Sequence, residues 1–350
     1  MAGKSATRVC VTGATGFLAS ELVAQLLGHG YHVSATVRSL ANRERNACLH
    51  DLPGASSESL TLFEANLLDE GAFDECVAGA KYVFHTASPF VTSNITDPQS
   101  QLVRPAVDGT RNVFGSIARA VASGHQRPRV VVTSSVAAML ATFADKDSCF
   151  DESDWNTLSR AEGNPPGDGL DMYRFSKVAA EREAWAQAAA QQLELATVLP
   201  SFIVGPPRTP RTDGESLRNM RQALEGTMPH RADTPMVDVR DVAAAHVAAA
   251  ETATAANKRF LVTSPQAIPR AHVLRLLAAQ YPGFQIADAG EPPDAASLRQ
   301  LFCGKNTAAV LGITPRSVDD SLLDMAAAML SFGVVQPRPR AEAAAPREEL

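Results

Sequence analysis

Short apolar runs alternate with longer segments of helical periodicity along most of the chain. Runs rich in β-branched residues are typical of parallel strands buried on both faces, and apolar residues three or four apart are typical of helices packed on such strands. The strands predicted are the run around Val9 and Val11 and residues 31–37, 59–63, 81–85, 129–133, 195–199, 236–239 and 259–263. The helices predicted are residues 18–27, 70–78, 98–122, 170–192, 240–255, 270–281 and 319–332, with irregular chain at 207–235 and 282–318. This alternation predicts an α/β fold, a doubly wound parallel sheet of the Rossmann type, with a smaller C-terminal lobe.

A glycine-rich turn joins the first predicted strand to the first predicted helix. Gly13 and Gly16 lack a Cβ, which allows a tight turn, and a pyrophosphate can then sit against N–H groups at the positive end of the helix. Ala19 is small enough to stand where dinucleotide-binding turns usually have a third glycine. With a strand on each side of the turn and helix, the pattern predicts a dinucleotide site. The alternative is a glycine turn without a ligand.

Polar residues that follow the next strands suggest which dinucleotide binds. Arg38 ends the second strand, where an acidic residue would suit the 2′-hydroxyl of NAD and an arginine suits the 2′-phosphate of NADP. Arg43 and Arg45 are within reach of the same loop, or they face solvent on the next helix. Asn66 can reach the adenine ring, or it is a turn residue or helix cap. The sequence therefore predicts NADPH over NADH.

The fourth predicted strand ends in His85 and is followed by small residues. Thr86 and Ala87 would let the cofactor lie against the backbone. His85 could be a general base, but a histidine that ends an apolar strand is more often a hydrogen-bonded structural residue. We expect the structural role.

The domain organisation follows from where the regular alternation stops. Residues 7–200 are expected to form the NADP-binding domain, and 236–263 to return to it. The less regular segments 201–235 and 264–335 would form a substrate lobe. Residues 1–6 would be a short polar leader, and 336–350, rich in Pro, Arg, Glu and Ala, a disordered tail.

Composition narrows the classes of partner. The chain has 350 residues, 45% hydrophobic and 20% charged, which is ordinary for a globular protein. Its net charge of −6 argues against nucleic acid as a partner, and it lacks the run of about 18 apolar residues that a membrane span needs. The odd number of widely spaced cysteines predicts reduced thiols in a cytosolic compartment and no metal site. These cysteines are Cys10, Cys48, Cys76, Cys149 and Cys303.

Three residues could carry proton chemistry. Tyr173 and Lys177 are four residues apart on one face of a predicted helix. A positive charge near a phenol favours the phenolate and would lower the pKa of Tyr173 from its ordinary value of about 10. Such a tyrosine can protonate a carbonyl oxygen, and the hydroxyl of Ser135, just after the fifth strand, can hold the same oxygen. The Tyr/Lys spacing is common by itself. In a chain that begins with a predicted dinucleotide turn, it indicates a site for proton transfer.

Several motifs together resemble the extended short-chain dehydrogenases/reductases: Thr12-Gly-Ala-Thr-Gly-Phe-Leu18, Thr133-Ser-Ser135, Tyr173-x-x-x-Lys177 and Pro200-x-x-x-x-Gly205-Pro206. Within them, a closer resemblance is to the dihydroflavonol 4-reductase / cinnamoyl-CoA reductase group, which includes methylglyoxal reductase-like carbonyl reductases that use NADPH. The segments that carry it are Asn66–Asp74, Val83–Pro89 and Val237–Val242. The resemblance spans residues 7 to about 330.

The resemblance implies roles for the residues at matching positions. Tyr173 would be the proton donor, Lys177 would bind the nicotinamide ribose and lower the pKa of Tyr173, and Ser135 would orient the substrate carbonyl. Besides Tyr173 and Lys177, the residues implied to bind NADP(H) are Gly13, Ala14, Thr15, Gly16, Phe17 and Leu18 for the pyrophosphate, Arg38 and Arg45 for the 2′-phosphate, Asn66 and Leu67 for the adenine, and Pro200 and Ile203 near the nicotinamide.

Three departures from the family pattern bear on function. Ala106 stands where many extended members have the asparagine of a proton relay, and Asn66 stands where many have aspartate. The Asn-Trp-Tyr-Cys-Tyr signature of cinnamoyl-CoA reductases is absent, which argues against a thioester substrate.

We therefore expect reduction of a small-molecule aldehyde or ketone by NADPH, in a monomer or homodimer. One alternative is an NAD-dependent nucleotide-sugar epimerase or 3β-hydroxysteroid dehydrogenase, against which Arg38 argues. Another is a non-catalytic NADP(H)-binding sensor, which would have no need of Ser135, Tyr173 and Lys177 together.

Overall fold

The computed structural model describes residues 7–88, 95–142, 144, 148–229, 233–290 and 299–339. The expected leader, residues 1–6, and residues 340–350 of the expected tail lie outside this part of the chain.

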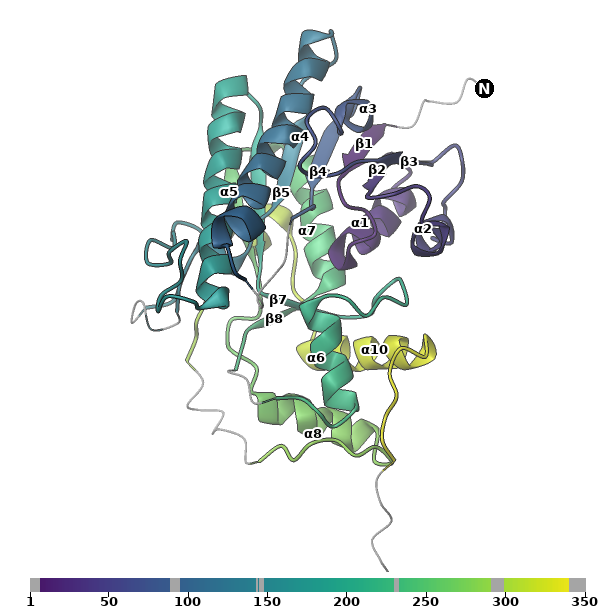
Figure 1. Cartoon of the computed structure of the whole chain (residues 1–350), viewed down its shortest axis with the longest axis vertical. Helices are drawn as coiled ribbons and strands as arrows, with labels where there is room; N and C mark the ends of the chain where they lie inside the picture. The colour runs from purple at the N-terminus through teal and green to yellow at the C-terminus, as the bar shows by residue number, and fades with distance from the viewer. Residues whose placement is uncertain are drawn as a thin grey trace, which may run out of the picture.

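A parallel sheet of seven strands forms the centre of the molecule (Figure 1), with the strand order β3-β2-β1-β4-β5-β6-β9. The order reverses direction between β1 and β4, as in doubly wound sheets. The predicted α/β Rossmann fold is confirmed. The strands are β1 (Arg8–Val11), β2 (His32–Val37), β3 (Leu60–Glu64), β4 (Tyr82–His85), β5 (Arg129–Thr133), β6 (Leu195–Pro200) and β9 (Lys258–Val262).

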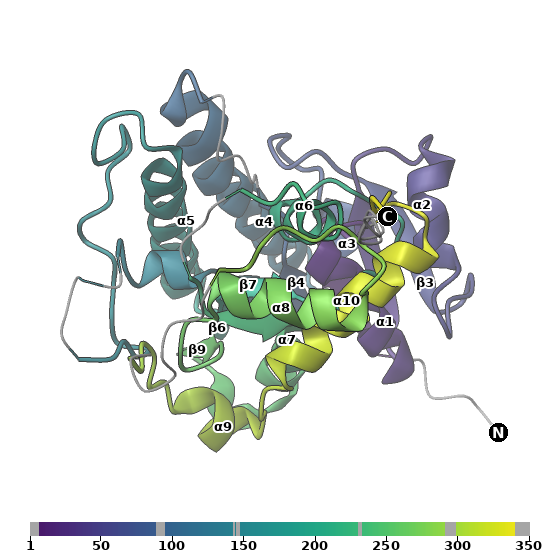
Figure 2. The same cartoon turned by 90° about the horizontal axis from the view of Figure 1, so that it is seen from below.

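Helices cover both faces of this sheet (Figures 1 and 2). On one face α1 (Phe17–Gly28) packs beside α7 (Val239–Glu251), and their alanines, valines and leucines share a buried cluster with β1 and β2. On the other face α4 (Arg104–Ala122) packs beside α5 (Gly169–Gln191) over a second cluster. The shorter helices of this half are α2 (Arg43–His50) and α3 (Asp74–Val77).

A separate apolar cluster lies at one end of the molecule, below the sheet in Figure 1, where α6 (Glu215–Leu224), α8 (Arg270–Gln280) and α10 (Val318–Ser331) meet. A second, two-stranded sheet joins it, made of β7 (Phe202–Val204) and β8 (Met236–Asp238). The strand expected at 236–239 therefore does not return to the main sheet, although α7 and β9 do.

Three further expectations about secondary structure are corrected. Helices α6 and α9 (Asn306–Leu311) lie in segments expected to be irregular, because each is too short to show a long apolar period. The helix expected over 98–122 begins with a π-helical turn at Gln99–Val103. Residues 336–339, assigned to the tail by composition, pair with the chain after α8, where the N–H of Gln285 donates to the carbonyl of Arg338 at 2.8 Å.

The expectation of five reduced cysteines is wrong for two of them. Cys149 and Cys303 form a disulfide across 154 residues of sequence, whereas Cys10, Cys48 and Cys76 are free. The two sulfurs meet because Phe150 and Phe302 pair in a short parallel bridge and pack their rings together. Spacing along the chain carries no trace of this bridge.

Within the described ranges, no helix has the length and apolar character needed to cross a membrane.

One buried ion pair ties α5 to the sheet. The guanidinium of Arg259, on β9, donates to both carboxylate oxygens of Glu181 on α5, at 2.8 and 3.1 Å, and the two side chains are 8% and 0% exposed. The same carboxylate accepts the hydroxyls of Ser134 (2.6 Å) and Thr197 (2.9 Å), which follow β5 and lie in β6. Since all its polar neighbours are hydrogen-bonded donors, this charge is compensated inside the protein.

Arg259 also connects this centre to the loop after β5. Its remaining N–H groups donate to the carbonyls of Glu152 (2.9 Å) and Asp154 (2.5 Å), and its guanidinium lies 4.0 Å from the ring centre of Trp155. The pair therefore joins one helix, three strands and one loop.

Replacing Glu181 by Gln should lower the free energy of unfolding by about 3–5 kcal/mol, because a buried pair that loses one charge leaves the other uncompensated. The measurement is urea unfolding of the purified protein, followed by circular dichroism.

Glu183→Gln, on the same helix, is the matched control for this experiment. Glu183 pairs with the more exposed Arg111 at 2.9 Å, and we expect a loss below about 1 kcal/mol. Equal losses in the two variants would contradict the role given to the buried pair.

Candidate active site

The candidate site lies at the carboxyl ends of the central strands, where the strand order reverses between β1 and β4. The turn after β1, the small residues after β4, Ser135 after β5 and the N-terminal half of α5 all meet there.

The glycine turn packs tightly against the segment after β4 and leaves the start of α1 open. Gly13 has φ +71°, and a Cβ on it would come within 3.1 Å of the Ala87 side chain. Gly16 caps α1 without any side-chain hydrogen bond, and the first turn of α1 has no acidic residue. The positive end of the helix is thus left open for an anion, so these residues fit a dinucleotide pyrophosphate.

Thr12 joins the ends of β1 and β4. Its hydroxyl oxygen accepts the N–H groups of Thr86 (3.1 Å) and Ala87 (3.0 Å), so its proton is available to Nδ1 of His85 at 3.0 Å. Burial, and then the nearby charge of Lys177, lower the pKa of His85 to about 4. His85 is therefore neutral at physiological pH and acts as a hydrogen-bonded structural residue.

Tyr173, Lys177 and Ser135 come together at the first turns of α5. This helix begins at Gly169 because the carboxylate of Asp168 accepts the N–H groups of Leu170 and Asp171. The phenol of Tyr173 hydrogen-bonds the Ser135 side chain. Lys177 Nζ lies 5.5 Å from the centre of the Tyr173 ring and donates to Ser88 Oγ at 2.9 Å.

The pKa of Tyr173 differs from the sequence expectation. Burial raises the pKa of Tyr173 above its ordinary range, and the hydrogen bond from Ser135 opposes this only in part. Burial also lowers the pKa of Lys177 to about 8. The prediction that Lys177 lowers the pKa of Tyr173 is not met here, because the ammonium faces the ring and Ser88 while desolvation of the phenol dominates. The phenol is consequently protonated at neutral pH.

A small cavity of about 20 Å³ lies beside Lys177. Ala106 and Thr110 of α4 line it together with Ser88 and Ser134. Both polar and apolar side chains line it, and it has room for about one water molecule. Ala106, at the position of the relay asparagine in many relatives, is thus placed next to the lysine by the fold.

The arginines near the end of β2 have different surroundings. Arg38 and Arg43 are exposed, and their side chains make no hydrogen bond or ion pair with the residues that the structure describes. Arg45 is half-exposed, and its Nη2 lies 3.0 Å from the carboxylate of Asp213. Asp213 also pairs with Arg211, whose Nη1 donates to the carbonyl of Thr15 at 2.6 Å. The sequence analysis missed Arg211 and Asp213; the cluster of arginines after Pro207 was the available signal.

The remaining predicted residues are distributed around this edge. Asn66 bonds Asp69 and the N–H of Leu68, as a turn residue does, and Leu67 packs against α4 at Gly109. Phe17 contacts both the sheet cluster and the C-terminal cluster. Other residues expected at the cofactor are Ala14 and Leu18 in the turn and helix α1, Pro200 at the end of β6, and Ile203 in β7, which packs on the sheet cluster.

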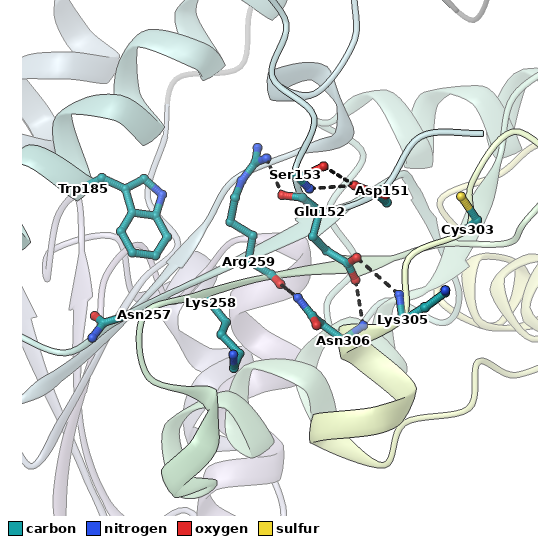
Figure 3. A pocket seen from close by; sticks show the side chains of 10 residues that line it. All are labelled: Asp151, Glu152, Ser153, Trp185, Asn257, Lys258, Arg259, Cys303, Lys305 and Asn306. Atoms are coloured by element: carbon teal, nitrogen blue, oxygen red, sulfur yellow. Dashed lines mark hydrogen bonds between the residues drawn. The ribbon is translucent and has the colours of Figure 1, made fainter. Parts of the chain in front are cut away.

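A wider depression of about 610 Å³ lies elsewhere on the molecule (Figure 3). It is lined by residues of β9, by Trp185 of α5, and by the loops around Glu152 and Lys305. The carboxylate of Glu152 accepts the N–H groups of Lys305 and Asn306 (Figure 3). None of the predicted catalytic or cofactor residues lines this depression, so we do not assign it to the reaction.

The described part of the chain contains no group of three or more His, Cys, Asp or Glu side chains arranged to hold a metal ion.

Comparison with known proteins gives the family. Residues 9–262 match the NAD dependent epimerase/dehydratase family. The chain is 36% identical to cinnamoyl-CoA reductase CAD2 of Medicago truncatula, covering 80% of this chain and 82% of the relative. It is 34% identical to tetraketide alpha-pyrone reductase 1 of Arabidopsis thaliana, covering 93% and 96%.

Solved structures agree with this match. The yeast methylglyoxal/isovaleraldehyde reductase Gre2, complexed with NADPH, superposes with a TM-score of 0.81 at 27% identity, covering 93% of this chain and 99% of the yeast one. A UDP-glucose 4-epimerase of Thermotoga maritima shares the fold at a TM-score of 0.69 and 18% identity. The chain therefore belongs to the NAD dependent epimerase/dehydratase family, within the extended short-chain dehydrogenases/reductases.

Proposed function

We propose that this protein reduces an aldehyde or ketone to the alcohol, with NADPH as the hydride donor and Tyr173 as the proton donor. The observation that carries the proposal is the meeting of Tyr173, Ser135 and Lys177 beside an open glycine turn. The chain is an oxidoreductase whose cofactor is NADP(H), which supplies the hydride when bound.

The protonation states suit reduction. The phenol of Tyr173 holds its proton at neutral pH, as an ordinary tyrosine does, and so has one to give to a carbonyl oxygen, although burial raises its pKa and makes it a weaker acid. The hydrogen bond between Ser135 and the phenol supports the proposal that the Ser135 hydroxyl holds the same carbonyl oxygen. Lys177, whose Nζ lies 5.5 Å from the ring centre of Tyr173, is proposed to bind the nicotinamide ribose.

The substrate is proposed as a small carbonyl compound rather than a thioester. The relatives are named for reducing cinnamoyl-CoA, tetraketide pyrones and methylglyoxal, and this chain lacks the cinnamoyl-CoA reductase signature. The substrate region would be made by the loop after Ser135 and by the lobe around α6, α8 and α10. Arg38, exposed after β2, favours NADPH over NADH as the cofactor. It therefore also argues against the NAD-dependent epimerase alternative.

The direct test is oxidation of NADPH by the purified protein with methylglyoxal, cinnamaldehydes, dihydroflavonols and simple diketones, with NADH in parallel. We expect turnover of at least one carbonyl compound with NADPH. Binding of NADPH without turnover of any compound would instead favour the sensor alternative.

Tyr173→Phe should lower kcat by at least about a hundredfold, because the variant has no phenolic proton to donate. Its Kd for NADPH, measured by fluorescence titration, should change by less than about threefold.

Tyr31→Phe is the matched control for this variant. It removes a phenolic hydroxyl that bonds Glu251 at 2.6 Å, away from the site, and should keep the wild-type rate. Normal turnover by Tyr173→Phe would show that another group donates the proton.

The reaction should slow as the pH rises through about 8. Burial lowers the pKa of Lys177 to about 8 from an ordinary value of 10.5, so the free enzyme loses this positive charge earlier than a surface lysine would. We expect kcat/KM for NADPH, which reports groups of the free enzyme, to fall about tenfold per pH unit above that value.

In Lys177→Arg the charge persists, so the alkaline fall should disappear even if the rate is lower. An identical fall in Lys177→Arg would assign the titration to another group.

Arg38→Ala should weaken NADPH binding by about ten- to a hundredfold and leave NADH binding unchanged, since hydrogen bonds between a guanidinium and a phosphate contribute about 1.5–3 kcal/mol. Arg43→Ala is the control, because Arg43 is equally exposed on the adjoining helix. A parallel loss of NADH affinity in Arg38→Ala would mean that the arginine supports the fold of the loop instead.

A further inference from the structure

A segment between β7 and α6, residues 205–214, crosses the positive end of α1; we call it the strap. In Figure 1 it reaches from the C-terminal half of the molecule toward α1 and α2. Arg208 pairs with the buried Glu21 of α1 at 2.6 Å, and Arg211 donates to the carbonyl of Thr15 at 2.6 Å. The strap is thus fastened to the helix and to the glycine turn itself.

Asp213 makes the third attachment, to α2. Its carboxylate accepts two hydrogen bonds from Arg211, Nε to Oδ1 at 2.7 Å and Nη2 to Oδ2 at 2.9 Å. The same Oδ2 accepts Nη2 of Arg45 at 3.0 Å. Burial raises the pKa of Asp213, but Arg211 and then Arg45 outweigh this and hold it below its usual range, so the carboxylate is ionised.

The three side chains are not equally free to move. Arg211 is 19% exposed and held by the Thr15 carbonyl as well as by Asp213, whereas the side chain of Asp213 is 57% exposed. The Asp213 side chain is therefore freer than that of Arg211 to move when a second anion approaches Arg45. Arg38, the other arginine expected at the 2′-phosphate, has no anionic partner among the described residues.

Arg45 is thus already occupied by a carboxylate at the place where a phosphate dianion is expected. If the 2′-phosphate and the Asp213 carboxylate both contacted the guanidinium of Arg45, the two anions would repel each other. Departure of the carboxylate, which carries the smaller charge, would relieve that repulsion. A planar guanidinium suits phosphate and carboxylate equally well in geometry, so charge decides in favour of the dianion.

We propose that Asp213 is a competitor for the 2′-phosphate: it holds Arg45 in the free enzyme, gives it up when a 2′-phosphorylated dinucleotide binds, and so weakens binding of NADPH and NADP⁺. This inference rests on the proposed use of NADP(H). Its consequence is that the strap is joined to α2 only while the phosphate subsite is empty, which favours release of the cofactor in either oxidation state.

The test uses Asp213→Asn, which keeps the shape of the side chain and removes the charge. Isothermal titration calorimetry at low salt compares 2′,5′-ADP with 5′-AMP, so the readout needs no turnover. We expect Asp213→Asn to bind 2′,5′-ADP about three- to tenfold more tightly than the wild type, with 5′-AMP unchanged, and the gain to shrink at high salt.

The matched control is Asp108→Asn, which neutralises a half-exposed aspartate paired with Arg111 on α4 at 3.1 Å. It should bind both ligands as the wild type does.

Other outcomes overturn the proposal. Weaker binding of 2′,5′-ADP by Asp213→Asn would mean that Asp213 orients the arginines for the phosphate. Equal gains for both ligands, or no gain, would mean that Asp213 does not act at the 2′-phosphate. If the wild type bound 2′,5′-ADP and 5′-AMP equally well, that result would contradict both the proposed competition by Asp213 and the preference for NADP(H). Failure to reduce any carbonyl compound, with discrimination kept, would contradict only the proposed reaction.

Discussion

The buried pair of Glu181 and Arg259 is the constraint on which the arrangement of the site depends. Lys177 lies one helical turn before Glu181, and the pair fixes that turn of α5 against β5, β6 and β9. Ser134, bonded to Glu181, precedes Ser135 in the chain. The serine that hydrogen-bonds the Tyr173 phenol and the lysine near its ring are therefore both positioned by one compensated charge. A buried pair is a poor source of stability compared with apolar packing; here it sets the orientation of a helix on a sheet.

The site combines rigid and movable parts. The turn after β1, the end of β4 and the start of α5 are held by backbone hydrogen bonds and by Thr12, which leaves little freedom where hydride and proton would move. The end of the strap near α2 is different: Arg208 pairs with the buried Glu21, but Asp213 is attached by exposed or partly exposed arginine–carboxylate pairs. Exposed pairs are weak and sensitive to salt, which is consistent with the proposed release of Arg45 by Asp213 when a cofactor binds.

The region expected to receive the substrate is built from distant parts of the chain. The loop after β5 is joined to the segment near residue 302 by the Phe150–Phe302 bridge, the Cys149–Cys303 disulfide and a small apolar cluster that includes Met139 and Leu301. The lobe of α6, α8 and α10 has its own core and meets the cofactor turn at Phe17. Under the proposed function, differences in these segments can change which carbonyl compound fits without changing the chemistry proposed at Tyr173.

The amino-acid sequence by itself determined the features that depend on near neighbours: the alternation of strands and helices, the glycine turn, and Tyr173 and Lys177 on one helical face. These follow from backbone sterics and from periods of two to four residues. Only the tertiary structure decided the disulfide, the pairing of β7 with β8, the partner of Arg45 and the direction of the Tyr173 pKa. Each of these depends on which groups from far along the chain surround a side chain, and on how much water they exclude from it.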